Sequence, residues 1–108
     1  MQVVKQACGP HILYRLLDDV GCTLGRAVTS ETSSEVRLHE IYVKPEYRSR
    51  GYGNALMRAI LSFDVTKLVT LCTGLTNISF FKQHEFKVTG TNDSLVFMSR
   101  KASMPKAE

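Results

Sequence analysis

The residues best suited to chemistry lie in the segment 43–56, where two glycines and two arginines separate an apolar run from a helical pattern. The first turn of a helix has backbone N–H groups without an internal partner, and the helix dipole adds about half a positive charge there. Gly51 and Gly53 carry no Cβ atom, so a pyrophosphate can approach these amides closely. Arg48 and Arg50 add positive charge at the rim. The segment therefore predicts a site for a phosphate-bearing ligand, although it matches neither the nucleotide-triphosphate loop nor the three-glycine dinucleotide pattern.

Strand-type patches alternate with turn signals in the chain that leads to this segment. The patches are residues 3–8, 11–17, 22–30 and 36–43. Gly9-Pro10, the hairpin-type sequence Asp18–Gly21 and the polar residues 31–34 separate them. We therefore expect an antiparallel meander of three or four strands that ends at the glycine-containing turn.

The hydrophobic period changes after this turn. Residues 53–61 predict a helix of about three turns that ends near Ser62. Its apolar stripe consists of Leu56, Ala59, Ile60 and Phe63. Residues 67–73 are β-rich and apolar, which is typical of a buried strand covered on both faces. The expected elements that follow are a short helix over 77–83 and strands over 86–89 and 95–99, joined by a turn over 90–93.

Length and composition fit one small globular domain. The chain has 108 residues, of which 44% are hydrophobic and 22% are charged, so a disordered, fibrous or low-complexity protein is excluded. We expect a single α/β (α+β) domain over residues 1–100, with a mixed, mostly antiparallel sheet and about two helices. A flexible tail is expected over residues 101–108.

The formal net charge of +4 favours an anionic partner, such as nucleic acid, an acidic protein surface or a phosphorylated cofactor, but it is also common among ordinary soluble proteins. Cys8, Cys22 and Cys72 are odd in number and outside any C-x-x-C pair, so they suggest neither a disulfide framework nor a zinc site. No signal-peptide core is present, and no apolar run approaches the ~20 residues needed to span a bilayer. We expect a cytoplasmic protein that uses no metal and no membrane.

The segment 43–56 resembles the signature of the GNAT superfamily of acetyl-CoA-dependent N-acetyltransferases. In that family a strand ends in Val-x-Pro, and the sequence continues with Arg or Gln, two residues, Gly, one residue, and Gly or Ala. This chain matches the signature with Val43-Lys44-Pro45 and Arg48-Ser49-Arg50-Gly51-Tyr52-Gly53. Residues 77–86 are similar to the family's Asn, aromatic pair and Gly-Phe segment. The resemblance covers about residues 38–88 and implies a GNAT-like fold with acetyl-CoA as co-substrate.

The resemblance implies a cofactor site made largely of backbone groups. The pyrophosphate would rest on the amides of residues 48–53, and the pantetheine arm would pair with the strand at residues 41–43, where two neighbouring strands splay apart. Asn77 would contact pantetheine or phosphate, and Phe81 would pack beside the thioester. The implied cofactor-binding residues are Ile41, Tyr42, Val43, Arg48, Ser49, Arg50, Gly51, Tyr52, Gly53, Asn54, Asn77 and Phe81.

Acetyl transfer to an amine requires a group that exposes the nitrogen lone pair, because a lysine amine with a pKa of about 10.4 is neutral in only about one molecule in 2,500 at neutral pH. His39 resembles the position at which some family members carry a catalytic histidine, and Glu40 is the other candidate base. Strand alternation places Glu40 opposite His39, unless a β-bulge reverses the parity. Under alternation, Ile41 and Val43 share the face of His39.

Two positions depart from the family pattern. Phe81 stands where the family often places a tyrosine acid, so the thiolate would leave unassisted or take a proton from water, Tyr42 or the acceptor. Glu85 replaces the glycine of the Gly-Phe segment. Cys72 is conceivable as an acyl-carrying nucleophile, but no partner base is evident and a core thiol is expected. His11 and His84 are expected to be surface or turn residues.

The first forty residues leave no room for the helices that most family members insert between their first two strands. The acceptor side is therefore expected to be open, which suits a protein N-terminus or lysine better than a small metabolite, unless a second subunit of a homodimer supplies the missing wall. The sequence predicts an acetyl-CoA-dependent N-acetyltransferase that acts by direct attack of the acceptor amine on the thioester.

Two alternatives stay open. The absent tyrosine and the altered Glu85-Phe86 also permit a non-catalytic module that binds acetyl-CoA. The other alternative is a small basic domain that binds nucleic acid or protein. Its cationic patch would consist of Lys44, Arg48, Arg50 and Arg58. Nucleic acid is the less favoured partner, because neither an interleaved aromatic platform nor a recognised nucleic-acid motif accompanies this charge.

Overall fold

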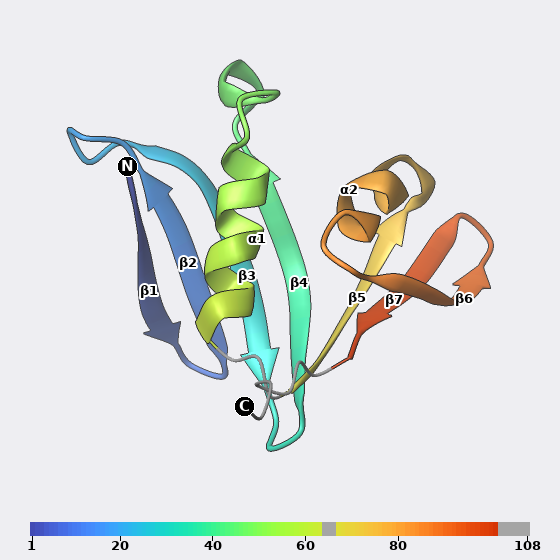
Figure 1. Ribbon diagram of the computed structural model, residues 1–108. Helices are drawn as coiled ribbons and strands as arrows, with labels where there is room; N and C mark the ends of the chain where they lie inside the picture. The colour runs from blue at the N-terminus through green and yellow to red at the C-terminus, as the bar shows by residue number, and fades with distance from the viewer. Residues whose placement is uncertain (64–66, 102–108) are drawn as a thin grey trace, which may run out of the picture.

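The computed structural model describes residues 1–63 and 67–101 (Figure 1). In this part of the chain, seven strands form one sheet in the order β1-β2-β3-β4-β5-β7-β6. The strands are β1 (Gln2–Cys8), β2 (His11–Leu17), β3 (Thr23–Glu31), β4 (Glu35–Val43), β5 (Leu68–Gly74), β6 (Lys87–Asn92) and β7 (Leu95–Arg100). The helices are α1 (Tyr52–Phe63) and α2 (Ile78–Lys82), with short 3-10 turns at Pro45–Tyr47 and Leu75–Asn77. Only β4 and β5 pair in parallel, so the predicted mixed, mostly antiparallel α+β domain is confirmed.

The predicted meander corresponds to β1–β4, which pair antiparallel in sequence order. Its turns are local in origin. Gly9 and Gly21 have φ angles of 59° and 89°, which favour glycine. The side chain of Asp18 accepts hydrogen bonds from the backbone N–H groups of Val20 and Cys22, at 3.0 and 2.8 Å. These signals are visible in the sequence, which is why this half of the fold was predictable.

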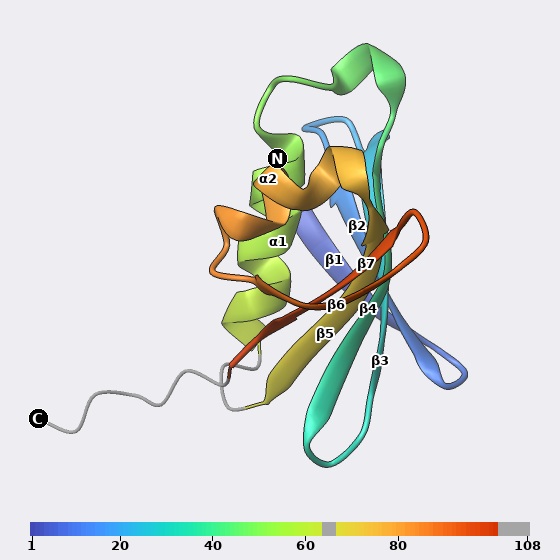
Figure 2. The same ribbon diagram turned by 90° about the vertical axis from the view of Figure 1, so that its right-hand side faces the viewer.

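Both helices lie on the same face of the sheet (Figure 2). The amphipathic helix α1 packs on β2, β3 and β4. Its buried side chains are Leu56, Met57, Ile60 and Leu61. The expected stripe was therefore right for Leu56 and Ile60, whereas Ala59 is only half-buried and the side chain of Phe63 lies outside the described structure. Neither described helix has the length and apolar character needed to cross a membrane.

The strand β5 was expected to be covered on both faces, but both helices lie on one face of the sheet. Val69 and Leu71 are buried, but Leu68 and Cys72 on the other face are exposed. The strand is not covered on both faces, because no described helix lies on the side of the sheet opposite α1 and α2. The expectation that Cys72 is a core thiol was wrong for the same reason.

The last hairpin turns later than expected. Asn92 pairs with Leu95, so the turn consists of Asp93 and Ser94, and Gly90 lies inside β6 beside a bulge. Asp93 has a φ of 54°, a conformation that aspartate tolerates and that suits a tight hairpin. The expected tail over 101–108 lies outside the described residues, except for Lys101.

Gly25 of β3 is expected to be indispensable for stability, because β3, β4 and α1 meet there. A Cβ atom on Gly25 would lie 2.7 Å from the carbonyl oxygen of Tyr42 and 3.3 Å from a methyl group of Leu56. We expect Gly25→Ala to lower the free energy of unfolding by about 1–3 kcal/mol in urea denaturation. Gly74→Ala is the control, because a Cβ there meets no described atom within 4 Å, and it should change stability by less than about 0.5 kcal/mol. Equal effects of the two substitutions would contradict this packing.

Candidate active site

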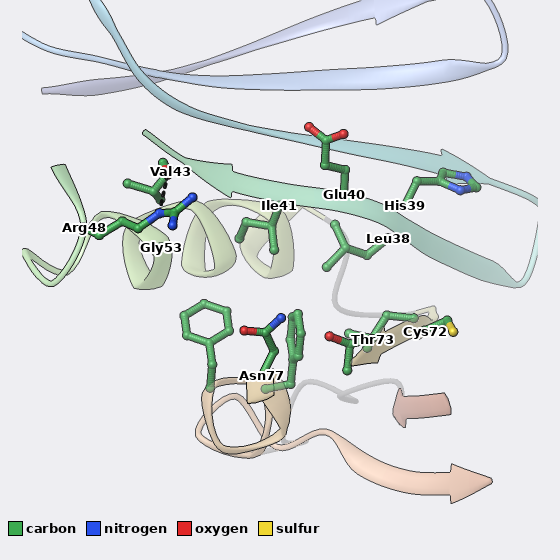
Figure 3. A pocket seen from close by; sticks show the side chains of 13 residues that line it. Leu38, His39, Glu40, Ile41, Val43, Arg48, Gly53, Cys72, Thr73 and Asn77 are labelled. Atoms are coloured by element: carbon green, nitrogen blue, oxygen red, sulfur yellow. Dashed lines mark hydrogen bonds between the residues drawn. The ribbon is translucent and has the colours of Figure 1, made fainter. Parts of the chain in front are cut away.

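A cleft opens where β4 and β5 separate. Their parallel pairing runs from Glu35 opposite Leu68 to Leu38 opposite Leu71, and no further pair is formed within the described chain although both strands continue. The resulting cavity of about 460 Å³ lies between the end of β4, the end of β5 and α2 (Figure 3). It is lined by Leu38, His39, Glu40, Ile41, Val43, Arg48, Gly53, Leu71, Cys72, Thr73, Asn77, Phe80 and Phe81. The splayed strands that the resemblance implied are present.

A β-bulge in β4 decides which side chains face this cleft. Leu38 pairs with Thr29 and Glu40 pairs with Val28, so His39 is an extra residue in the register. Leu38 is buried in the core under the helices, and Ile41 and Val43 pack against the same core. The expectation that Ile41 and Val43 share the face of His39 was therefore wrong, because the bulge shifts the alternation by one residue.

The bulge places both candidate bases on the face of the sheet that carries no helix. Nε2 of His39 lies 2.7 Å from the hydroxyl oxygen of Ser30, and its ring packs edge-on against His11 at 5.2 Å between centroids. Glu40 accepts a hydrogen bond of 2.7 Å from Nε of Arg26 in an exposed ion pair. In Figure 3 the Glu40 carboxylate points away from α2, whereas Ile41 points toward it. Simple alternation had placed the two candidates on opposite faces of the sheet. The β-bulge, the alternative left open above, places them on the same face.

The glycine-containing loop forms a second, smaller hollow next to the cleft. Its volume is about 230 Å³, and its lining consists of Val43, Tyr47, Arg48, Ser49, Gly51, Tyr52, Gly53, Asn54 and Phe80. Gly51 has a φ of 83° and open space around the position of a Cβ, as a backbone anion cradle at the start of α1 requires. Gly53 also allows α1 to pack closely against Phe80, because a Cβ on Gly53 would lie 3.2 Å from the ring of Phe80.

The arginines of the loop are held by specific contacts. Nε of Arg48 donates a hydrogen bond of 2.8 Å to the carbonyl oxygen of Val43, and its guanidinium lies 5.4 Å from the ring centre of Tyr42. The guanidinium of Arg50 lies 5.9 Å from the ring centre of Tyr47. Of the predicted cofactor-binding residues, only Tyr42 and Arg50 line neither the cleft nor the smaller hollow.

Asn54 links α1 to the segment after α2. Its Oδ1 lies 2.9 Å from Nε2 of His84, whose ring also packs against Phe80 at 5.3 Å. His84 lies in the turn after α2, as expected, and is half-buried. Burial, together with the positive charges of Arg58 and Arg100, lowers the pKa of His84 below its ordinary value. The contact between Asn54 and His84 fixes the start of α1 relative to the end of α2. These two helices form two walls of the site.

The lowered pKa of His84 predicts a pH-dependent stability. As the pH falls, the unfolded chain takes up this proton before the folded chain does, so stability that is present above the unfolded-state pKa of about 6.5 decreases below it. We expect the free energy of unfolding to fall more steeply between about pH 7.5 and about pH 5 in the wild type than in His84→Gln. Urea denaturation at each pH measures this difference. Parallel pH profiles of the two proteins would contradict the assignment.

Phe80 is the residue of the site that the sequence interpretation missed. It lines both hollows and packs on Phe81 at 5.1 Å. Its signal was the first position of the aromatic pair in residues 77–86, but only Phe81 was assigned to the site. Phe81 itself is 5% exposed and also packs on Phe86, so it belongs to the core and to the cleft wall together. Thr73 and Cys72 complete the β5 side of the cleft.

The described residues contain no candidate metal-binding cluster. Among residues 1–63 and 67–101, no group of three or more His, Cys, Asp or Glu side chains lies close enough to hold a metal ion.

The fold combines splayed parallel strands with a glycine-containing loop at the start of α1, and comparison with known proteins identifies its family. The family model described as "Acetyltransferase (GNAT) domain" matches residues 10–88. The chain therefore belongs to the GNAT acetyltransferase family, whose co-substrate is acetyl-CoA. No curated protein matched the sequence.

Solved structures of several acetyltransferases share the fold. The PaiA N-acetyltransferase of Thermoplasma acidophilum, in complex with coenzyme A, is 22% identical with a TM-score of 0.72, over 85% of this chain and 61% of its own. The ribosomal-protein-S18-alanine N-acetyltransferase of Escherichia coli is 20% identical, with a TM-score of 0.74 over 93% and 74% of the two chains. A GNAT family acetyltransferase of Elizabethkingia anophelis with acetyl-CoA bound is 9% identical, with a TM-score of 0.78 over 93% and 97%. The chain thus spans between about three fifths and nearly all of the length of these proteins.

Proposed function

We propose that this protein transfers the acetyl group of acetyl-CoA to an amine of a polypeptide, either an N-terminus or a lysine. The observation that carries the proposal is the opening between β4 and β5. The cleft on the helix side shares Leu38, His39, Leu71 and Cys72 with a second cavity on the opposite face of the sheet. A thioester held on one side and an amine approaching from the other side can meet there.

The residues present fit acetyl-CoA. The amides around Gly51 would hold the pyrophosphate, and the unpaired edge of β4 beyond Leu38 would hold the pantetheine arm. Asn77, in the 3-10 turn before α2, and Phe80 of α2 would enclose the arm. When bound, acetyl-CoA supplies an activated acetyl group as a thioester.

His39 is the base that this geometry favours. It lines both cavities, whereas Glu40 lines only the cleft and is paired with Arg26. The imidazole can accept the proton that the attacking amine must lose, directly or through water. Ser30, at 2.7 Å from Nε2, is a positioning residue that fixes the ring.

The leaving thiolate would meet no phenol at position 81, because Phe81 stands at the position of the family's tyrosine. Tyr42 lines neither hollow of the cofactor site, which argues against it as the acid. Protonation of the thiolate by water or by the acceptor fits the apolar wall that Phe80 and Phe81 form.

The acceptor side is open. β1 and β2 are joined directly at Gly9-Pro10, with no helix between them, so the far face of the sheet is accessible beside His39. A polypeptide can lie across such a surface, whereas a small metabolite needs an enclosing pocket to lose most of its hydration.

The proposal is tested by incubating the protein with acetyl-CoA and two peptides. One peptide has a free α-amine and no lysine, and the other has a blocked α-amine and one lysine. Mass spectrometry should show the gain of one acetyl group on at least one peptide, dependent on the protein. Efficient acetylation of a free polyamine without acetylation of either peptide would contradict the proposal. Binding of acetyl-CoA without transfer to any amine would favour the non-catalytic alternative.

A further inference from the structure

The cavity on the helix-free face of the sheet has a chemical character of its own. Its volume is about 350 Å³. The side chains that give it this character are Arg37, His39, Thr70, Cys72, Thr89 and Phe97. Phe97 is 40% exposed and provides an apolar wall on the β7 side of the cavity. Because His39 is shared with the cofactor cleft, a ligand in this cavity lies next to the proposed point of transfer.

Arg37 is the cation of this cavity, and its guanidinium has no hydrogen bond or ion pair with any residue that the structure describes. Two acidic side chains lie on the same face of β4, and each has another partner. Glu35 accepts a hydrogen bond of 2.8 Å from the hydroxyl of Thr70, and Glu40 is paired with Arg26 at 2.7 Å. The cavity therefore holds a guanidinium whose donors remain available, because neither neighbouring carboxylate is bonded to Arg37.

We infer that the acceptor carries a carboxylate close to its reacting amine and that Arg37 binds this carboxylate, so the preferred substrate is a polypeptide with acidic residues next to the amine. A guanidinium recognises a carboxylate through two parallel, charge-assisted hydrogen bonds. Arg37 is two positions from His39 along β4, a separation of about 6–7 Å in a strand. An acidic side chain on the first residues of an extended peptide spans this distance. The inference rests on the proposed function, because it names the substrate class of the same site.

The test compares three peptides that are identical except at the second and third residues, which are both acidic, both the corresponding amides, or both lysine. With the wild-type protein, kcat/KM for the acidic peptide should exceed that for the amide peptide by about 10-fold or more. Arg37→Glu should reverse the order, so that the lysine peptide becomes the best substrate. Lys5→Glu is the matched control, because it makes the same charge change on the edge strand β1, opposite Tyr14 on the helix-bearing face, and it should keep the acidic preference.

Calorimetry of acetyl-CoA binding to Arg37→Glu separates a local effect from misfolding, because this variant should bind acetyl-CoA as the wild type does. Equal kcat/KM for the three peptides would overturn this inference and leave the proposed function standing. An equal loss for all three peptides in Arg37→Glu would overturn it as well, because recognition of a carboxylate must be selective. If no peptide is acetylated at all, the proposed function fails, and this inference fails with it.

Discussion

Gly51→Glu is expected to weaken acetyl-CoA binding by about 100-fold or more. The new side chain would begin at a backbone with a φ of 83° and would project from the amide loop that is proposed to hold the pyrophosphate. A carboxylate there repels a phosphate, and a like-charge contact costs several kcal/mol. A loss of about 2.7 kcal/mol corresponds to 100-fold in affinity. Isothermal titration calorimetry measures the change.

Gly21 provides an unusually close control for this experiment. It has a φ of 89°, and a Cβ on it, as on Gly51, would meet no described atom within 4 Å. Gly21→Glu therefore introduces the same backbone strain and the same charge in the turn between β2 and β3. It should bind acetyl-CoA like the wild type, and equal affinities of the two variants would contradict the placement of the pyrophosphate. Gly53 is less informative, because a Cβ there would also displace Phe80.

His39→Asn is expected to lower kcat by about 100- to 1,000-fold while the affinity for acetyl-CoA changes little. His39 lines both cavities and its imidazole is proposed to take the proton of the amine, whereas the proposed pyrophosphate loop lines a separate hollow that does not include His39. Stopped-time assays with a peptide acceptor, together with calorimetry, separate these quantities.

Two further variants, in Glu40 of β4 and Ser30 of β3, test whether His39 or Glu40 is the base. Glu40→Gln removes an exposed ion pair with Arg26 but no group that lines both cavities, so its kcat should fall by less than about 3-fold. Ser30→Ala removes the 2.7 Å contact to Nε2 of His39 and should give an intermediate loss that appears in kcat. A large loss in Glu40→Gln together with a small loss in His39→Asn would exchange the two assignments.

The parts of the fold that sequence reasoning predicted are those encoded locally. The meander from β1 to β4 follows from turn residues such as Gly9 and Asp18, and the amide loop follows from the spacing of Arg48, Gly51 and Gly53. Each signal requires only residues that are close in sequence. The GNAT resemblance depends on the same local motifs.

The parts that were missed depend on partners far away in sequence. The bulge at His39 arises from the register of β4 against β3, so the shared face of His39 and Glu40 was not readable from alternation. The exposure of Cys72 depends on which face the helices cover. The cavity that contains Arg37 and Phe97 requires β4, β5 and β7 to lie side by side. Such arrangements are properties of the sheet as a whole.

The most direct test of the account uses a bisubstrate analogue, in which the sulfur of coenzyme A is joined through an acetyl bridge to the N-terminal amine of a peptide. The central claim is that thioester and amine meet at the opening between β4 and β5, so the conjugate should occupy both cavities at once. Because binding of the second part becomes intramolecular, we predict that the analogue binds about 100-fold or more tightly than coenzyme A alone in calorimetry. A conjugate that binds no more tightly than coenzyme A would show that the two cavities do not form one reaction site.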